Sequence, residues 1–176
     1  MTTHSHPLEP NAGNLATCDV GRFEDLRPPE QFTLWAIRMW VLGKRRDRQV
    51  GRRLREGFAQ IGAPSATVWL ETMMRTLTSN LCRNVIVHCA CDRRTSADEH
   101  MLLELLARGQ VGDEETVLRR LNEFIIPSAV HTAGPLVTRF GETLADGGLL
   151  LGSPCYRTDP AAMPAVTSTQ QSFRLH

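Results

Sequence analysis

The stretch SATVWLETMMRTLTSNLCRNVIVHCACDRRTSADEHMLLELLA, residues 65–107, contains two helical patterns that flank a cluster of cysteines and histidines. Apolar side chains recur every three or four residues from Ser65 to about Leu81, and again after Ser96. That spacing is typical of amphipathic helices, which bury one side against a neighbour. The cysteines and histidines of the segment gather between or beside the two helical patterns. We therefore predict two packed helices flanking a connection that carries reactive side chains.

The second of these helices has the clearest start signal in the chain. Ser96-Ala97-Asp98-Glu99 matches a capping box, in which the Ser and Glu side chains each bond the other residue's backbone N–H. Upstream, Val85-Ile86-Val87 is β-branched throughout and favours an extended backbone over more helix. Because we find no partner for it in the sequence, we predict no sheet.

Helical spacing also fills most of the remaining chain. Further helices are predicted over 28–42, 47–61, 113–126 and 128–145. Gly43 should end the first of them, and Gly134-Pro135 should split or kink the last, since proline removes a helical hydrogen bond. We predict an all-α fold, a six- or seven-helix bundle or orthogonal helical array. It forms a single domain over residues 20–152, with a disordered segment over 1–19 and a flexible tail over 153–176.

Composition limits the classes of function. The 176 residues suit one domain, and 20 basic against 19 acidic residues leave a net charge of +1. A chain with so small a net charge has no strong electrostatic field to attract it to nucleic acid or to a membrane. No segment approaches the roughly 20 apolar residues of a membrane span. Five cysteines, without a secretory signal, fit a reducing compartment, so we expect a cytoplasmic protein.

Motifs of common enzymes are missing from the sequence. It contains no GxxxxGK[ST] or GxGxxG phosphate loop, no HExxH and no ExxH pair of di-iron bundles. His88 precedes Cys89 directly, and adjacent side chains point apart, so the two do not form a nucleophile and its base. We assign no catalytic residue and expect a non-enzymatic protein without a cofactor.

Three hypotheses remain open for the cysteine cluster. Its candidate ligands, if it held zinc, are Cys82, His88, Cys89, Cys91 and His100. The Cys-x6-Cys-x-Cys spacing lacks the two separated arms of most structural zinc sites. We favour packed thiols, with Cys82 and Cys89 as small buried hydrophobes. The third hypothesis is a redox pair, with a thiol pKa lowered by nearby arginines, namely Arg83, Arg93 and Arg94.

A second cluster is basic. Lys44-Arg45-Arg46 is followed by a predicted helix face that carries Arg48, Arg52, Arg53 and Arg55. Guanidinium groups suit carboxylates or phosphates, so this face would bind an acidic protein, although a solvated helix face has the same composition. Helix 65–81 would be the DNA-reading helix of a helix-turn-helix, yet Arg75 is its one cation, so nucleic acid is a weaker alternative.

These features together predict a small helical protein that acts through macromolecular contacts in regulation or assembly. The partner is expected to be another protein, with the arginine face as its binding surface. The first alternative is a zinc-binding or redox-sensing protein centred on Cys82–Cys91. The second is a DNA-binding regulator.

Overall fold

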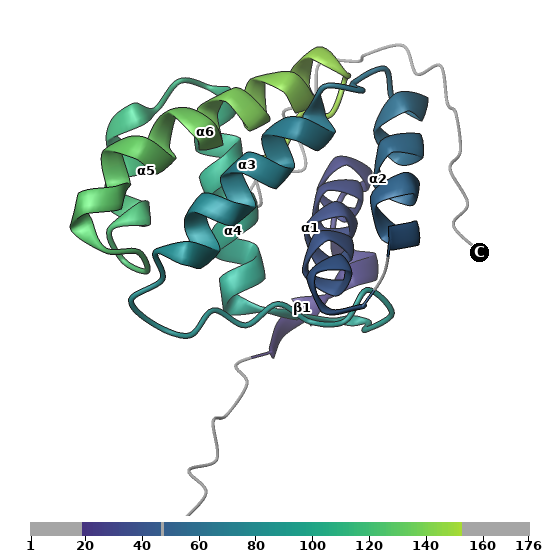
Figure 1. The fold of residues 1–176 in the computed structure, drawn as a ribbon, viewed down its shortest axis with the longest axis horizontal. Coiled ribbons are helices and arrows are strands. Elements are labelled where there is room, and N and C mark those ends of the chain that lie inside the picture. Colours follow the sequence, from purple (N-terminus) through teal and green to yellow (C-terminus); the bar gives the residue numbers. More distant parts are fainter. Residues whose placement is uncertain (1–18, 47, 153–176) are drawn as a thin grey trace, which may run out of the picture.

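The computed structural model describes residues 19–46 and 48–152, although not the side chains of Asp19, residues 44–46 or Arg48. Six α-helices occur in this part of the chain, which confirms the predicted all-α fold (Figure 1). They are α1 Pro28–Arg46, α2 Arg48–Gln60, α3 Ala66–Ser79, α4 Ala97–Gln110, α5 Glu114–Leu121 and α6 Pro127–Asp146. None of these helices is long and apolar enough to cross a membrane.

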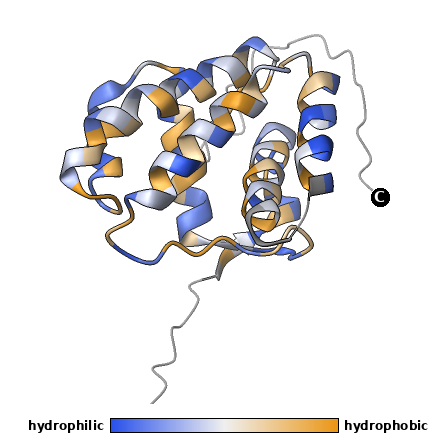
Figure 2. Cartoon of the chain, in the orientation of Figure 1, coloured by the Kyte–Doolittle hydropathy of each residue, from blue (hydrophilic) through white to orange (hydrophobic). Residues whose placement is uncertain are grey.

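Helices α1 and α2 form an antiparallel pair at one end of the array (Figure 1). Leu34, Ile37 and Trp40 of α1 are buried, as its apolar surface predicts. The helix continues through Gly43, so the predicted end there is wrong. A side chain at Gly43 would lie 3.1 Å from that of Val50, so this glycine lets α2 pack closely against α1. Figure 2 shows that α2 is mostly hydrophilic, consistent with one narrow buried stripe.

Helices α3, α4 and α6 make the centre of the fold. The ring of Phe140 on α6 meets that of Phe58 on α2 edge-on, with centroids 6.2 Å apart. Helices α4 and α6 approach backbone to backbone, because a side-chain carbon at Gly141 would lie 3.0 Å from the Leu106 carbonyl oxygen. The predicted break at Gly134-Pro135 is absent, since α6 is continuous through Pro135. Pro135 lies on the exposed side, where its ring meets solvent.

Two other helices end before the predicted residue, and α3 ends at Ser79 rather than near Leu81. Helix α5 ends at Leu121, and the turn after it buries Phe124 and Ile125. Ser65 precedes α3 without a side-chain capping bond. Val68 of α3 is 64% exposed, because it lies outside the buried face of that helix. That face consists of Ala66, Leu70, Met73, Met74 and Leu77.

A small sheet was not predicted. Strand β1, Asp19–Arg22, is followed by a 3-10 turn, Phe23–Asp25, and pairs antiparallel with β2, Arg94–Ser96. The strands are short and more than 70 residues apart, so neither shows a pattern in the sequence that points to the other. Val85–Val87 lies in neither strand. It belongs to the connection from α3 to β2, which runs beneath α3, α4 and α1 (Figure 1).

Candidate functional site

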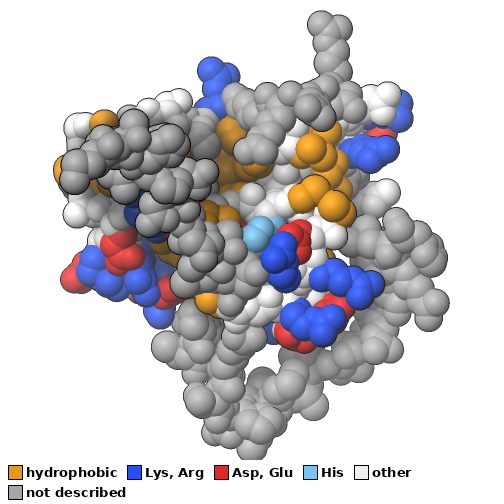
Figure 3. All heavy atoms as spheres, turned by 90° about the horizontal axis from the view of Figure 1, so that it is seen from below, with side chains coloured by type: hydrophobic (Ala, Val, Ile, Leu, Met, Phe, Trp, Pro, Cys, Tyr) orange, Lys and Arg blue, Asp and Glu red, His pale blue; other side chains and the backbone are white. Residues whose placement is uncertain are grey.

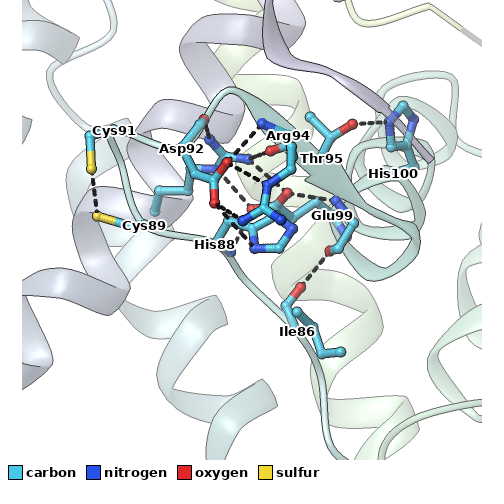
Figure 4. A network of polar contacts seen from close by, with 11 residues as sticks. Ile86, His88, Cys89, Cys91, Asp92, Arg94, Thr95, Glu99 and His100 are labelled. Atoms are coloured by element: carbon cyan, nitrogen blue, oxygen red, sulfur yellow. Dashed lines mark hydrogen bonds and ion pairs between the residues drawn. The ribbon is translucent and has the colours of Figure 1, made fainter. Parts of the chain in front are cut away.

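The connection contains a tight turn that brings two thiols together. The backbone N–H of Asp92 donates to the carbonyl oxygen of Cys89 at 3.0 Å, which closes a four-residue turn. Cys89 and Cys91 occupy its first and third positions, and their Sγ atoms lie 3.0 Å apart. Both side chains are exposed and point away from the polar cluster behind them (Figure 4). The turn therefore presents a preformed pair of accessible thiols.

Both ends of this turn are attached to one buried ion pair. Just before the turn, the N–H of His88 donates to Oε1 of Glu99 at 2.9 Å. At its last residue, the carbonyl oxygen of Asp92 accepts from Nη1 of Arg38 at 2.6 Å. Figure 4 shows this cluster behind the two thiols. The turn that carries the thiols is thus held at both ends by the side chains of one ion pair.

The ion pair itself joins α1 to α4. Arg38 and Glu99 form two parallel bonds, Nε to Oε1 and Nη2 to Oε2, each 2.8 Å long. Both side chains are fully buried, and Arg38 also donates to the carbonyl oxygen of Arg94 at 2.6 Å. A fork-to-fork pair with further backbone bonds is the arrangement that makes burial of two charges tolerable. We call Arg38 and Glu99 the buried clamp.

The predicted capping box is confirmed, and it has a second role. Ser96 Oγ accepts from the N–H of Glu99 at 3.1 Å, and Glu99 accepts from the N–H of Ser96 at 3.0 Å. The same hydroxyl donates to the carbonyl oxygen of Ile86 at 2.6 Å, while the N–H of Ile86 donates to Asp98 at 2.7 Å. The start of α4 therefore fixes the path of the connection as well as its own first turn.

The two thiols differ in acidity. The pKa of Cys89 is lowered, because the backbone N–H and the thiol of Cys91 stabilise its thiolate by hydrogen bonding. The pKa of Cys91 is raised by its hydrogen bond to Cys89 and by the negative charge of the Cys89 thiolate. The predicted cause, nearby arginines, is wrong. Arg94 pairs with Asp92 at 2.9 Å and holds the pKa of that carboxyl well below its usual range.

The remaining zinc candidates contact other residues. The Nε2 atom of His100 is 2.8 Å from Thr95 Oγ1, and Nδ1 of His88 is 3.9 Å from Asp92 Oδ2. Cys82 lies at the other end of the connection, where its N–H donates to the Phe124 carbonyl oxygen. Over residues 19–46 and 48–152, no group of three or more His, Cys, Asp or Glu is placed to hold a metal ion.

The prediction that Cys82 and Cys89 are packed in the core is wrong, since both are exposed. The reason is that the connection runs over the surface and directs Val85 and Val87, rather than its cysteines, toward the core. The missed functional residue is Arg38. Its signal was a lone cation within the otherwise apolar stretch Leu34–Leu42, which calls for a buried acidic partner.

On α2, the predicted exposure of Arg52, Arg53 and Arg55 is confirmed. The side chain of Arg48 lies outside the described residues. Arg52 pairs with Glu56 at 3.3 Å, a surface contact that contributes little to stability. On α3, the one cation, Arg75, lies 3.9 Å from Glu71 on the same helix.

Comparison with known proteins adds no assignment: no family model matches the chain, and no similar curated protein or solved structure was found.

Proposed function

We propose that this protein is a redox sensor in which Cys89 and Cys91 interconvert between a dithiol and a disulfide. The observation that carries the proposal is the 3.0 Å separation of two exposed sulfur atoms within one closed turn. Two residues span at most about 7 Å of chain, and a turn shortens that span. This short span is compatible with the range of about 4.4–6.8 Å between Cα atoms that a disulfide needs.

The reaction needs an oxidant, which we take to be a disulfide. The thiolate of Cys89 attacks one sulfur of that disulfide, forming a mixed disulfide and releasing the other sulfur as a thiolate. The thiolate of Cys91 then attacks Cys89 Sγ, closing the Cys89–Cys91 bond and releasing the second sulfur. The protein loses two electrons and two protons, and the oxidant becomes two thiols. The lowered pKa of Cys89 suits the first attack.

The surroundings suit a reversible bond. An exposed disulfide in a small ring is more easily reduced than a buried structural one. In the cytoplasm, where the cysteine content leads us to place the protein, the pair would be reduced at rest and would respond to oxidation. Because the buried clamp holds both ends of the turn, the thiols stay aligned without a search through loop conformations.

The test uses a protein in which Cys18, Cys82 and Cys155 are replaced by serine. It is equilibrated in mixtures of reduced and oxidised glutathione, trapped by alkylation and analysed by mass spectrometry. We expect an intramolecular disulfide, and only a glutathione adduct in the Cys89→Ser and Cys91→Ser variants. As a matched control, a variant that keeps Cys82 and Cys91 alone should not close. A pair that stays reduced in oxidised glutathione, or a control that closes equally well, would contradict the proposal.

A second candidate function is binding of an acidic protein to α2. It is supported by three exposed guanidinium groups on one 13-residue helix, Arg52, Arg53 and Arg55. Polyglutamate serves as the probe. Binding should weaken as salt rises and disappear when these three arginines and Arg48 become glutamine. Unchanged binding by that variant would rule out the surface.

A further inference from the structure

An apolar pocket is lined in part by the connection that carries the thiol pair. It has a volume of about 150 Å³ and lies between α1, α3, α4 and the connection. Its walls include Leu77, Val85, Val87 and Phe124, and Thr78 is the one polar side chain among the described residues that line it. Figure 3 shows the underside of the molecule, where hydrophobic side chains gather next to a group of charged ones.

The pocket and the thiols share one segment of chain. Val85 and Val87 line the pocket, and Cys89 follows two residues later. That step covers at most about 7 Å of backbone, so the Cα atoms of a pocket-lining residue and of the reactive cysteine are no further apart than that. The bond from the His88 N–H to Glu99 lies between them and holds this spacing.

The rim of the pocket continues as exposed apolar surface. Leu81, which lines the pocket, is 37% exposed, and Ile126 is 39% exposed. The two lie close together, because the N–H of Ile126 donates to the carbonyl oxygen of Asn80 at 2.9 Å and Leu81 forms a bridge with Ile125. A ligand that fills the pocket would therefore also contact apolar surface at the rim.

We propose that this pocket recognises the oxidant of the thiol pair, and that the oxidant is a polypeptide disulfide with an apolar side chain near its cysteine. The inference rests on the proposed function. An apolar cavity of about 150 Å³ holds benzene, which is the ring of a phenylalanine side chain. Glutathione disulfide is charged and has no group of that size. The pocket would thus favour a protein disulfide over glutathione.

The chemistry follows the steps already given, with the polypeptide in place of glutathione. The apolar side chain enters the pocket, and its neighbouring disulfide sulfur meets the Cys89 thiolate. Cys89 forms the mixed disulfide, Cys91 resolves it, and the polypeptide leaves as two thiols. Electrons and protons balance as before: the protein gives two of each to the polypeptide.

The experiment compares two symmetric peptide disulfides that differ at one position. One has phenylalanine two residues from its cysteine, and the other has serine there. Each oxidises the protein in which Cys18, Cys82 and Cys155 are serine, under stopped-flow conditions. We expect the phenylalanine peptide to react roughly tenfold faster or more, the size of effect that one apolar group has in a pocket. Added toluene should slow the phenylalanine peptide alone.

A matched pair of variants locates the effect. Thr78→Trp places an indole in the mouth of the pocket and should bring the ratio of the two peptide rates close to one. Ser79→Trp adds the same ring at the next, exposed position and should leave the ratio as in the parent protein. Equal peptide rates in the parent protein, or equal effects of the two variants, would overturn the pocket proposal. If neither peptide nor glutathione closes the pair, the proposed function fails instead.

Discussion

Replacement of Arg38 by methionine tests the buried clamp directly. Methionine fills much of the space of the arginine stem but has no donors. The change removes two bonds to Glu99 at 2.8 Å and two to the carbonyl oxygens of Asp92 and Arg94 at 2.6 Å. Glu99 would be left fully buried, with the backbone N–H groups of His88 and Ser96 bound to its carboxylate.

The expected loss of stability is about 3–5 kcal/mol, because a buried charge without its partner is far costlier than a lost surface pair. Domains are commonly stable by only about 5–15 kcal/mol, so the variant should be close to its limit. At a urea slope of about 2 kcal/mol per molar, the midpoint of unfolding should fall by about 2 M. The Cys89–Cys91 equilibrium with glutathione should shift as well, since Asp92 loses its attachment.

Arg75→Met is the matched control. Arg75 is exposed on α3 and lies 3.9 Å from Glu71, so its loss should change stability by less than about 0.5 kcal/mol. The double variant Arg38→Met, Glu99→Leu removes both charges and should recover part of the loss. If Arg38→Met costs no more than Arg75→Met, the ion pair does not hold the connection, and the argument for an aligned thiol turn is refuted.

Three further results are expected. Ionised Asp92 stabilises the folded state above about pH 4, and this contribution is lost as pH falls toward its lowered pKa. The urea midpoint of Asp92→Asn should therefore decline less than that of the parent protein between about pH 6 and pH 3. An unchanged decline would refute the lowered pKa of Asp92. Replacing Arg48, Arg52, Arg53 and Arg55 by glutamine should leave the melting temperature nearly unchanged, because the three described arginines among them are exposed, whereas a large drop would show internal pairing. Desalted protein should contain no stoichiometric zinc by elemental analysis and should melt at the same temperature with a chelator, and one equivalent of zinc would overturn this expectation.

The helical class and much of the element order could be predicted from the amino-acid sequence. Local signals suffice for these features, because the spacing of apolar residues and the capping box at Ser96 act within one or two helical turns. The exposed arginines of α2 followed for the same reason, since one narrow apolar stripe leaves the other faces to solvent. Local signals failed to predict helix ends where residues distant in the sequence pack against the helix. Helix α1 passes through Gly43, and α6 passes through Pro135, because packing outweighs a propensity cost of about 1–3 kcal/mol.

The candidate site depends on contacts between segments that are distant in the sequence. The sequence contains Cys89, Cys91, Arg38 and Glu99, but 61 residues separate the last two, and no local pattern pairs them. Their contact forms when α1 packs on α4, and it holds the connection on the surface with its cysteines outward. For this reason thiols that resemble buried hydrophobes by composition lie exposed in one turn. Helix periodicity is a property of neighbours in sequence, whereas the reactivity of these sulfur atoms depends on what the fold places behind them.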